Sequence, residues 1–194
     1  YDSIPFIGSY DGGGFRISNL IIDTNAFQYA GLFGYVAAGA ELENINLADV
    51  EITSSYSHDR YPGYVGPLAG YNEGTIQNCT ASGGMKSEVR SAVGGLVGYN
   101  TGTIAGCTAN CYLSGGSGSV VGGIAGYNRE TITACTASGS ISGGARSAVG
   151  GIVGYNTGTT EYSTANGCLA GGFDSVVGGI AGYDEGTTQT CTDN

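Results

Sequence analysis

The chain has 194 residues, of which 38 are Gly and 41% are hydrophobic, and its formal net charge is −10. This apolar content argues against disorder, and the acidic balance excludes nucleic acid as an expected partner, because phosphates require a basic surface. No apolar segment approaches the roughly 20 residues of a membrane-spanning helix, so we expect no membrane insertion.

Residues 1–63 are predicted to form atypical N-terminal coils with an insertion. The step from Gly34-Tyr35 to Gly70-Tyr71 is longer than the step between any two later Gly-Tyr pairs, which follow a 28-residue period. The segment 54–63 contains most of the eight additional positions. A loop that interrupts a repeat is a good candidate for a specific contact.

Residues 64–194 are predicted to be regular copies of one 28-residue unit. The Gly-Tyr pair of this unit recurs at Gly70-Tyr71, Gly98-Tyr99, Gly126-Tyr127, Gly154-Tyr155 and Gly182-Tyr183. A fixed period of this length indicates a repeat architecture, in which each unit buries its apolar face against its neighbours. The segment 92–103 matches the segment 148–159 most closely, which indicates a longer duplication that spans two units.

Alignment of the units on Gly-Tyr reveals four apolar columns, which begin at Val65, Leu68, Ile76 and Met85. In each unit these residues lie in three short segments separated by Gly, Asn or Ser, which suit strands better than helices. We therefore predict an all-β fold, a parallel β-solenoid with about one coil per 28-residue repeat and three strands per coil. We expect a single solenoid domain over residues 1–194, cut from a longer protein because it starts without Met and stops within a repeat.

Two polar or aromatic columns accompany the apolar ones. Asn72 begins a column that follows the tyrosine at a turn, where stacked amides can hydrogen-bond from coil to coil and Asn tolerates a left-handed backbone. The tyrosine column, which includes Tyr71 and Tyr99, either packs as a structural stack or faces outward as an aromatic stripe for glycans or peptides. The sequence pattern does not decide between these two orientations.

The repeated segments resemble the GLUG-motif family of bacterial surface proteins. Ala92–Cys107, Val120–Cys135 and Ala148–Ser163 are similar to the pattern GxVGGIVGYNxGTIxNC, with Ser163 where the family has Cys and Glu130 where it has Gly. The resemblance implies an extracellular or surface-bound module, because such repeats occur in adhesins, haemagglutinin-like proteins and non-catalytic parts of IgA-type peptidases. The family supplies no catalytic residues.

The candidate ligand-binding residues lie in the insertion and are Tyr56, His58, Asp59, Arg60 and Tyr61. Tyrosine offers a flat ring and a hydroxyl, and Asp and Arg can bind sugar hydroxyls or a protein partner. An ordinary solvated loop is the alternative. The set contains no framed nucleophile and base, so we predict no catalytic residues and no enzyme.

Four of the six cysteines share one column, at Cys79, Cys107, Cys135 and Cys191. Adjacent coils would allow disulfides, but we favour buried reduced thiols, because free Cys packs as a small hydrophobe. The cysteine spacing does not match a zinc site, and we expect no metal and no cofactor.

The acidic residues Asp23, Glu41, Glu43, Asp49 and Glu51 gather in the N-terminal third. A suitably spaced carboxylate pair hydrolyses glycosides, but we expect solvated strand residues.

The sequence thus predicts a non-enzymatic extracellular repeat module that presents an adhesion or ligand-binding surface or acts as a spacer. We expect a glycan or protein of a host or neighbouring cell as partner, and the open coil ends permit end-to-end self-association. One alternative is a non-catalytic accessory region of a large secreted peptidase or polysaccharide-active enzyme. The other is a carbohydrate-active β-helix enzyme.

Overall fold

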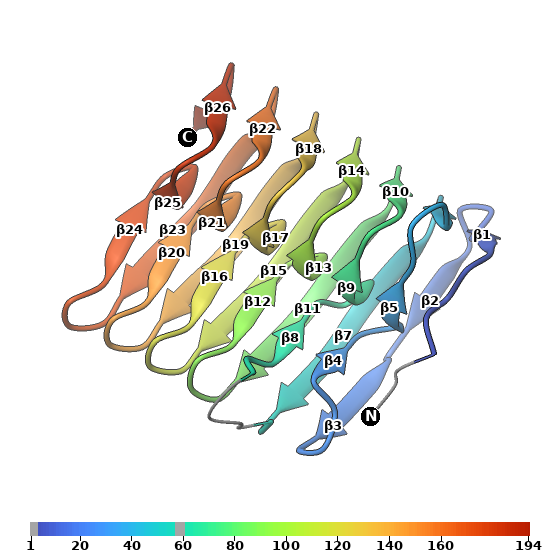
Figure 1. Cartoon of the computed structure of the whole chain (residues 1–194), viewed down its shortest axis with the longest axis horizontal. Coiled ribbons are helices and arrows are strands. Elements are labelled where there is room, and N and C mark those ends of the chain that lie inside the picture. The colour runs from blue at the N-terminus through green and yellow to red at the C-terminus, as the bar shows by residue number, and fades with distance from the viewer. Residues whose placement is uncertain (1–3, 57–60) are drawn as a thin grey trace.

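The structure is a computed structural model that describes residues 4–56 and 61–194. In these residues it contains strands and no helix, and therefore no helix long and apolar enough to cross a membrane. The strands form four parallel sheets, and the chain visits each sheet in turn on every coil (Figure 1). The fold is a parallel β-solenoid of about six coils, as the repeat predicts.

The four sheets are numbered in the order in which the chain first enters them. Sheet 1 contains β1 (Ser9–Asp11), β6 (Glu41–Glu43), β10 (Thr75–Gln77), β14 (Thr103–Ala105), β18 (Thr131–Thr133), β22 (Thr159–Glu161) and β26 (Thr187–Gln189). Sheet 2 contains β2 (Arg16–Ser18), β3 (Ile21–Thr24), β7 (Asn46–Ser54), β11 (Thr80–Ser87), β15 (Thr108–Gly115), β19 (Thr136–Gly143), β23 (Thr164–Gly171) and β27 (Thr192–Asp193). Sheet 3 contains β4 (Tyr29–Ala30), β8 (Tyr64–Val65), β12 (Ala92–Gly94), β16 (Val120–Gly122), β20 (Ala148–Gly150) and β24 (Val176–Gly178). Sheet 4 contains β5 (Phe33–Val36), β9 (Ala69–Asn72), β13 (Val97–Asn100), β17 (Ala125–Asn128), β21 (Val153–Asn156) and β25 (Ala181–Asp184).

The first coil has five strands, β1 to β5, and each later complete coil has four, so the prediction of three strands per coil was wrong. The additional corner divides the Val-Gly-Gly-Leu-Val segment, in which β12 ends at Gly94 and β13 begins at Val97. A Cβ atom at Gly94 would overlap the carbonyl oxygen of Val97, so only glycine allows the backbone to fold back this closely. The sequence shows this segment as one apolar stretch, which conceals the corner.

The strand register follows the 28-residue period in the regular coils, where Ile76 pairs with Ile104. At the N-terminal side the period changes. Ser54 pairs with Ser87 at a sequence offset of 33, whereas Tyr64 pairs with Ala92 at the regular offset. Five of the eight additional residues therefore lie between Ser54 and Tyr64, at the predicted insertion.

The four predicted apolar columns fill the interior of the solenoid. Leu68, Ile76 and Met85 are at most 1% exposed, and burial of each such side chain stabilises the fold by about 1.5–3 kcal/mol. The columns open to solvent only at the last coil, where Val177 is 45% exposed although its counterpart Val149 is fully buried. Self-association through the coil ends stays a prediction.

The column that begins at Asn72 forms the predicted ladder of hydrogen-bonded amides. Asn72 Nδ2 donates to Asn100 Oδ1 at 2.8 Å, and the same contact continues through Asn128 and Asn156 to Asp184. The left-handed backbone lies elsewhere, further along the coil: φ is +52° at Asn78, and Asn72 has no positive φ. The Asn72 column therefore does not use the left-handed backbone that asparagine tolerates.

All six cysteines are free thiols. Within the shared column the backbone N–H of Cys79 donates to Cys107 Sγ at 3.3 Å. Where Ser163 replaces cysteine, the N–H of Cys135 donates to Ser163 Oγ at 3.2 Å instead. The column therefore links the coils through hydrogen bonds, and serine substitutes for cysteine because both side chains are small acceptors.

Candidate binding site

An open pocket of about 1230 Å³ lies at the N-terminal end of the solenoid, where the repeat is least regular. Its walls come from the N-terminal segment, from β4 and β5 and their flanking turns, and from the two ends of the insertion. The described lining is rich in aromatic rings, which belong to Phe6, Phe27, Tyr29, Phe33, Tyr35, Tyr56 and Tyr61. Concave sites lined mostly by apolar and aromatic side chains are typical of ligand binding.

Two of the five predicted site residues, Tyr56 and Tyr61, line this pocket. His58, Asp59 and Arg60 lie outside the described residues. The rings that the preceding coil contributes to the pocket, such as Phe27 and Tyr29, were not predicted from the sequence. A signal for them was present, because Tyr29 and Tyr64 occupy a column that contains only Ala or Val in the later coils.

Hydrogen bonds hold the two sides of the pocket together. Gln28 Nε2 donates to the carbonyl oxygen of Pro62 at 3.2 Å, and the backbone N–H of Tyr64 donates to the carbonyl oxygen of Gln28 at 2.7 Å. In the turn that precedes Gln28, the hydroxyl oxygen of Thr24 accepts a hydrogen bond from the backbone N–H of Phe27 at 3.3 Å. This turn leaves the Phe27 ring 68% exposed.

Ring contacts join the pocket to the rest of the solenoid. Tyr29 stacks on Tyr64 with ring centroids 5.7 Å apart, and Phe6 packs against Phe33 at 4.8 Å. Aromatic pairs of this kind stabilise by about 0.5–1.5 kcal/mol beyond the area that they bury. The pocket wall is therefore preorganised, which lowers the cost of ordering it around a ligand.

The tyrosine column lies on the outside of the solenoid, which answers the question that the sequence left open. Its hydroxyls reach exposed partners: Tyr155 donates to Glu185 at 2.9 Å, and Tyr99 accepts from Arg129 Nη1 at 3.3 Å. The ring centroids of successive coils are 4.9–5.4 Å apart, from Tyr35 to Tyr183. Because the rings lie against one another, the column offers edges and hydroxyls to a ligand, whereas the pocket offers ring faces.

Glu73 is the acidic residue that the structure places beside the tyrosines of the pocket. Burial and a hydrogen bond with Glu73 raise the pKa of Tyr35 to about 12, and burial also raises the pKa of Tyr29. Both phenols therefore remain protonated at neutral pH. The described lining of the pocket itself contains no charged side chain.

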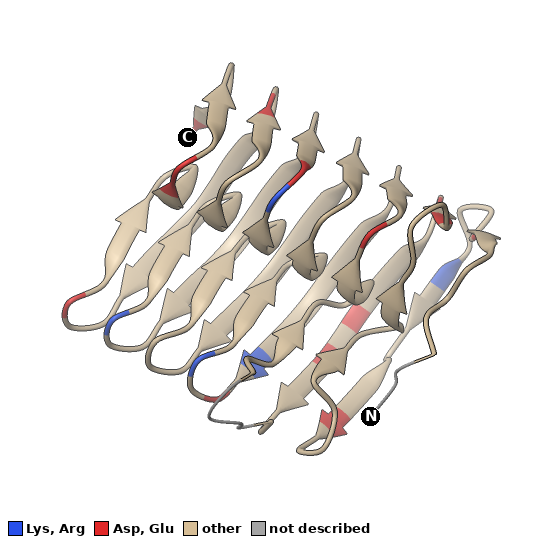
Figure 2. Ribbon diagram, in the orientation of Figure 1, with Lys and Arg blue, Asp and Glu red and all other residues tan. Residues whose placement is uncertain are grey.

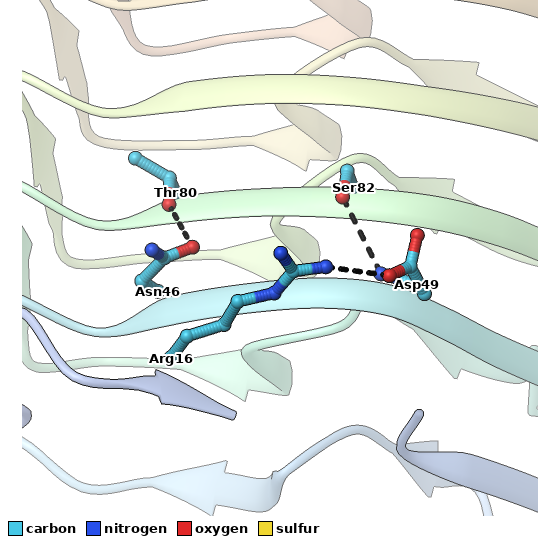
Figure 3. A network of polar contacts seen from close by, with 5 residues as sticks. All are labelled: Arg16, Asn46, Asp49, Thr80 and Ser82. Carbon is cyan, nitrogen blue, oxygen red and sulfur yellow. Dashed lines mark hydrogen bonds and ion pairs between the residues drawn. The ribbon is translucent and has the colours of Figure 1, made fainter. Parts of the chain in front are cut away.

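The acidic residues of the N-terminal third lie mainly on the surface of sheets 1 and 2 (Figure 2). Asp49 accepts from Arg16 at 2.6 Å across two neighbouring strands, and Glu43 accepts from Gln77 Nε2 at 3.1 Å. Figure 3 shows the Arg16–Asp49 pair beside contacts from Thr80 to Asn46 and between Ser82 and the backbone of Asp49. These contacts join neighbouring coils.

Across the part of the chain that the structure describes, no group of three or more His, Cys, Asp or Glu residues could hold a metal ion.

The fold and the repeat define the molecule as a parallel β-solenoid repeat protein. Residues 90–115, which include β12 and β13, match the family model of the GLUG motif, so the resemblance noted above is confirmed for this segment. Over 82 residues, which are 42% of the chain, the sequence is 38% identical to halomucin from Haloquadratum walsbyi. The aligned part spans about 1% of the length of halomucin. No solved structure gives a significant match.

Proposed function

We propose that this chain is a non-enzymatic repeat module of an extracellular or cell-surface protein and that it binds a partner molecule through the aromatic pocket. The pocket carries this proposal, because it lies where the repeat fails and where residues from two coils meet. The rest of the solenoid would hold the pocket at a distance from its attachment. The partner is a glycan or a protein outside the cell.

Four observations support this function. Residues 90–115 match the GLUG motif, and part of the chain is similar to halomucin, whose name is that of a mucin, a class of extracellular protein. The pocket has the concave, aromatic character of a binding site. Among the acidic residues of sheets 1 and 2, Asp49 contacts Arg16 and Glu43 contacts Gln77 across neighbouring coils, which favours a structural role for these two carboxylates.

The proposal can be tested with the labelled chain on arrays of glycans and extracellular proteins. The pocket variant combines Phe27→Ala with Tyr61→Ala, both at exposed rings. The control variant combines Tyr112→Ala with Tyr162→Ala, which are 68% and 60% exposed and do not line the pocket. A third variant replaces residues 57–60 by Gly and Ser and tests the remaining predicted site residues.

Binding that is lost in the pocket variant and kept in the control variant is the expected result. Binding that survives in both would contradict the assignment to the pocket and indicate a repeated face. If no array component binds the parent chain, the binding function is wrong and the module acts as a spacer.

A further inference from the structure

The ring faces of the pocket suit a restricted set of ligands. Phe27 is 68% exposed and Tyr61 is 49% exposed, so both present ring area toward solvent. Aromatic faces carry partial negative charge and attract cations that approach within about 6 Å of the ring centre. They also stack on apolar faces of neutral groups such as sugars. The polar groups beside the rings distinguish these two possibilities.

Apart from the hydroxyls of its four tyrosines, the described lining offers few groups for sugar hydroxyls. Gln28 is its one side-chain amide among the described residues, and Gln28 Nε2 already donates to Pro62. The hydroxyl of Tyr35 is hydrogen-bonded with Glu73. A bound sugar loses water from several hydroxyls and needs replacement partners. A cation needs only ring faces and a nearby negative charge.

Negative charge is present next to the pocket. The carboxylate of Glu73 interacts with Tyr29 and Tyr35, which both line the pocket. The whole chain has 16 acidic and 6 basic residues, so its field attracts cations from solution.

We propose that the pocket binds a basic peptide segment of a partner protein. A Lys or Arg side chain would lie against the rings of Phe27 and Tyr61, with its charge near Glu73. The volume of about 1230 Å³ admits several side chains, which favours a peptide over one small amine. This inference rests on the proposed function, which states only that the pocket binds a partner, and it names the chemistry of that partner.

The test is titration of the 194-residue chain into a fluorescent peptide of alternating Gly and Lys, beside the same peptide with Gln in place of Lys. Two variants alter the pocket: Phe27→Ala removes a ring face, and Glu73→Gln removes the adjacent charge. Glu185→Gln is a matched control. Glu185 occupies the same repeat position as Glu73 but lies far along the solenoid, where it accepts a hydrogen bond from the hydroxyl of Tyr155. Tyr112→Ala controls for the loss of an exposed ring.

We expect the Lys peptide to bind and the Gln peptide not to bind. Each pocket variant should weaken Lys-peptide binding at least fivefold, and each control should change it less than twofold. Unchanged circular dichroism will establish that the variants fold, and Phe27→Ala is expected to fold because its ring is exposed.

Equal weakening by Glu73→Gln and Glu185→Gln would overturn the inference, because it would show attraction by net charge alone. A neutral glycan that binds at the pocket in the arrays, with no response to the Lys peptide, would overturn the inference and leave the proposed function intact. Failure of every probe on the parent chain would overturn both.

Discussion

The side-chain amide of Asn72 donates to Oδ1 of Asn100 at 2.8 Å while both residues are fully buried. The same nitrogen also donates to the carbonyl oxygen of Gly74 at 3.2 Å. The Asn72 amide thus donates hydrogen bonds to a backbone carbonyl oxygen in its own coil and to a side-chain oxygen in the next coil. Buried polar groups stabilise a fold only when they are paired, and this column pairs them from coil to coil.

Substitution of Asn100 by Ala is expected to lower the free energy of unfolding by about 2 kcal/mol, because it removes the acceptor of one buried N–H of Asn72 and the acceptor of the part-buried backbone N–H of Gly102. Each such loss costs about 1–3 kcal/mol. Urea denaturation followed by circular dichroism measures the effect. Asn110→Ala on the exposed side of β15 is the control and should change stability by about 0.5 kcal/mol at most. Equal midpoints for the two variants would contradict a role of the ladder in stability.

Substitution of Gly122 by Ala should disrupt folding locally. A Cβ atom there would overlap the carbonyl oxygen of Ala125, and backbone cannot move as a flexible side chain does. Gly84→Ala provides the comparison, since a Cβ at Gly84 has no neighbour within 4 Å. We expect a loss of more than roughly 2 kcal/mol for Gly122→Ala and little change or a small gain for Gly84→Ala. Thermal unfolding of both proteins will show whether the corner requires glycine.

The six thiols should differ strongly in reactivity. Cys168 is exposed, whereas Cys111 is buried, and burial raises the pKa of the Cys111 thiol to about 12. Only the thiolate reacts, so at pH 8 iodoacetamide should label Cys168 first and Cys111 only after unfolding. Peptide mass spectrometry over a time course distinguishes the two sites. Rapid labelling of Cys111 in the folded protein would show that the coil interior opens to solvent.

The solenoid should lose stability in alkali partly through Tyr35. Its pKa of about 12 in the folded state lies above the value of about 10 in the unfolded chain. The unfolded state therefore releases this proton first, and the contribution is present below pH 10 and is lost as pH rises toward 12. Tyr35→Phe removes this ionisation. From pH 8 to pH 11.5, the urea midpoint should fall less for Tyr35→Phe than for the parent chain. An equal fall in both proteins would show that groups other than Tyr35 cause the loss of stability in alkali.

The repeated part of the fold was predictable from sequence because stacking copies each position. The apolar columns that begin at Val65 and Ile76 and the amide column that begins at Asn72 follow from the sequence alone, since residues one 28-residue period apart must meet. The corner at Gly94 was not, because the apolar residues on both sides of it continue one uninterrupted pattern. Local composition does not distinguish a bent apolar segment from a straight one.

The candidate site was predictable only in part. The insertion stood out because it breaks the period, which correctly drew attention to Tyr56 and Tyr61. Phe27 and Tyr29 were missed because their proximity depends on the register between the first two coils, where Tyr29 pairs with Tyr64 at an offset longer than the regular period. An irregular offset cannot be obtained by extending the 28-residue period. The orientation of the tyrosine column likewise required the structure, in which the column's hydroxyls contact exposed partners such as Glu185.

The amide ladder has a polarity, since each asparagine donates toward the C-terminal coil and the series ends on the carboxylate of Asp184. A coil duplicated between Asn100 and Asn128 would receive a hydrogen bond from one neighbour and donate one to the other without any new kind of contact. Each added coil would lengthen the molecule by about 4.8 Å. Gene duplication can therefore adjust the reach of such a protein in fixed increments while the pocket at its N-terminal end remains unaltered.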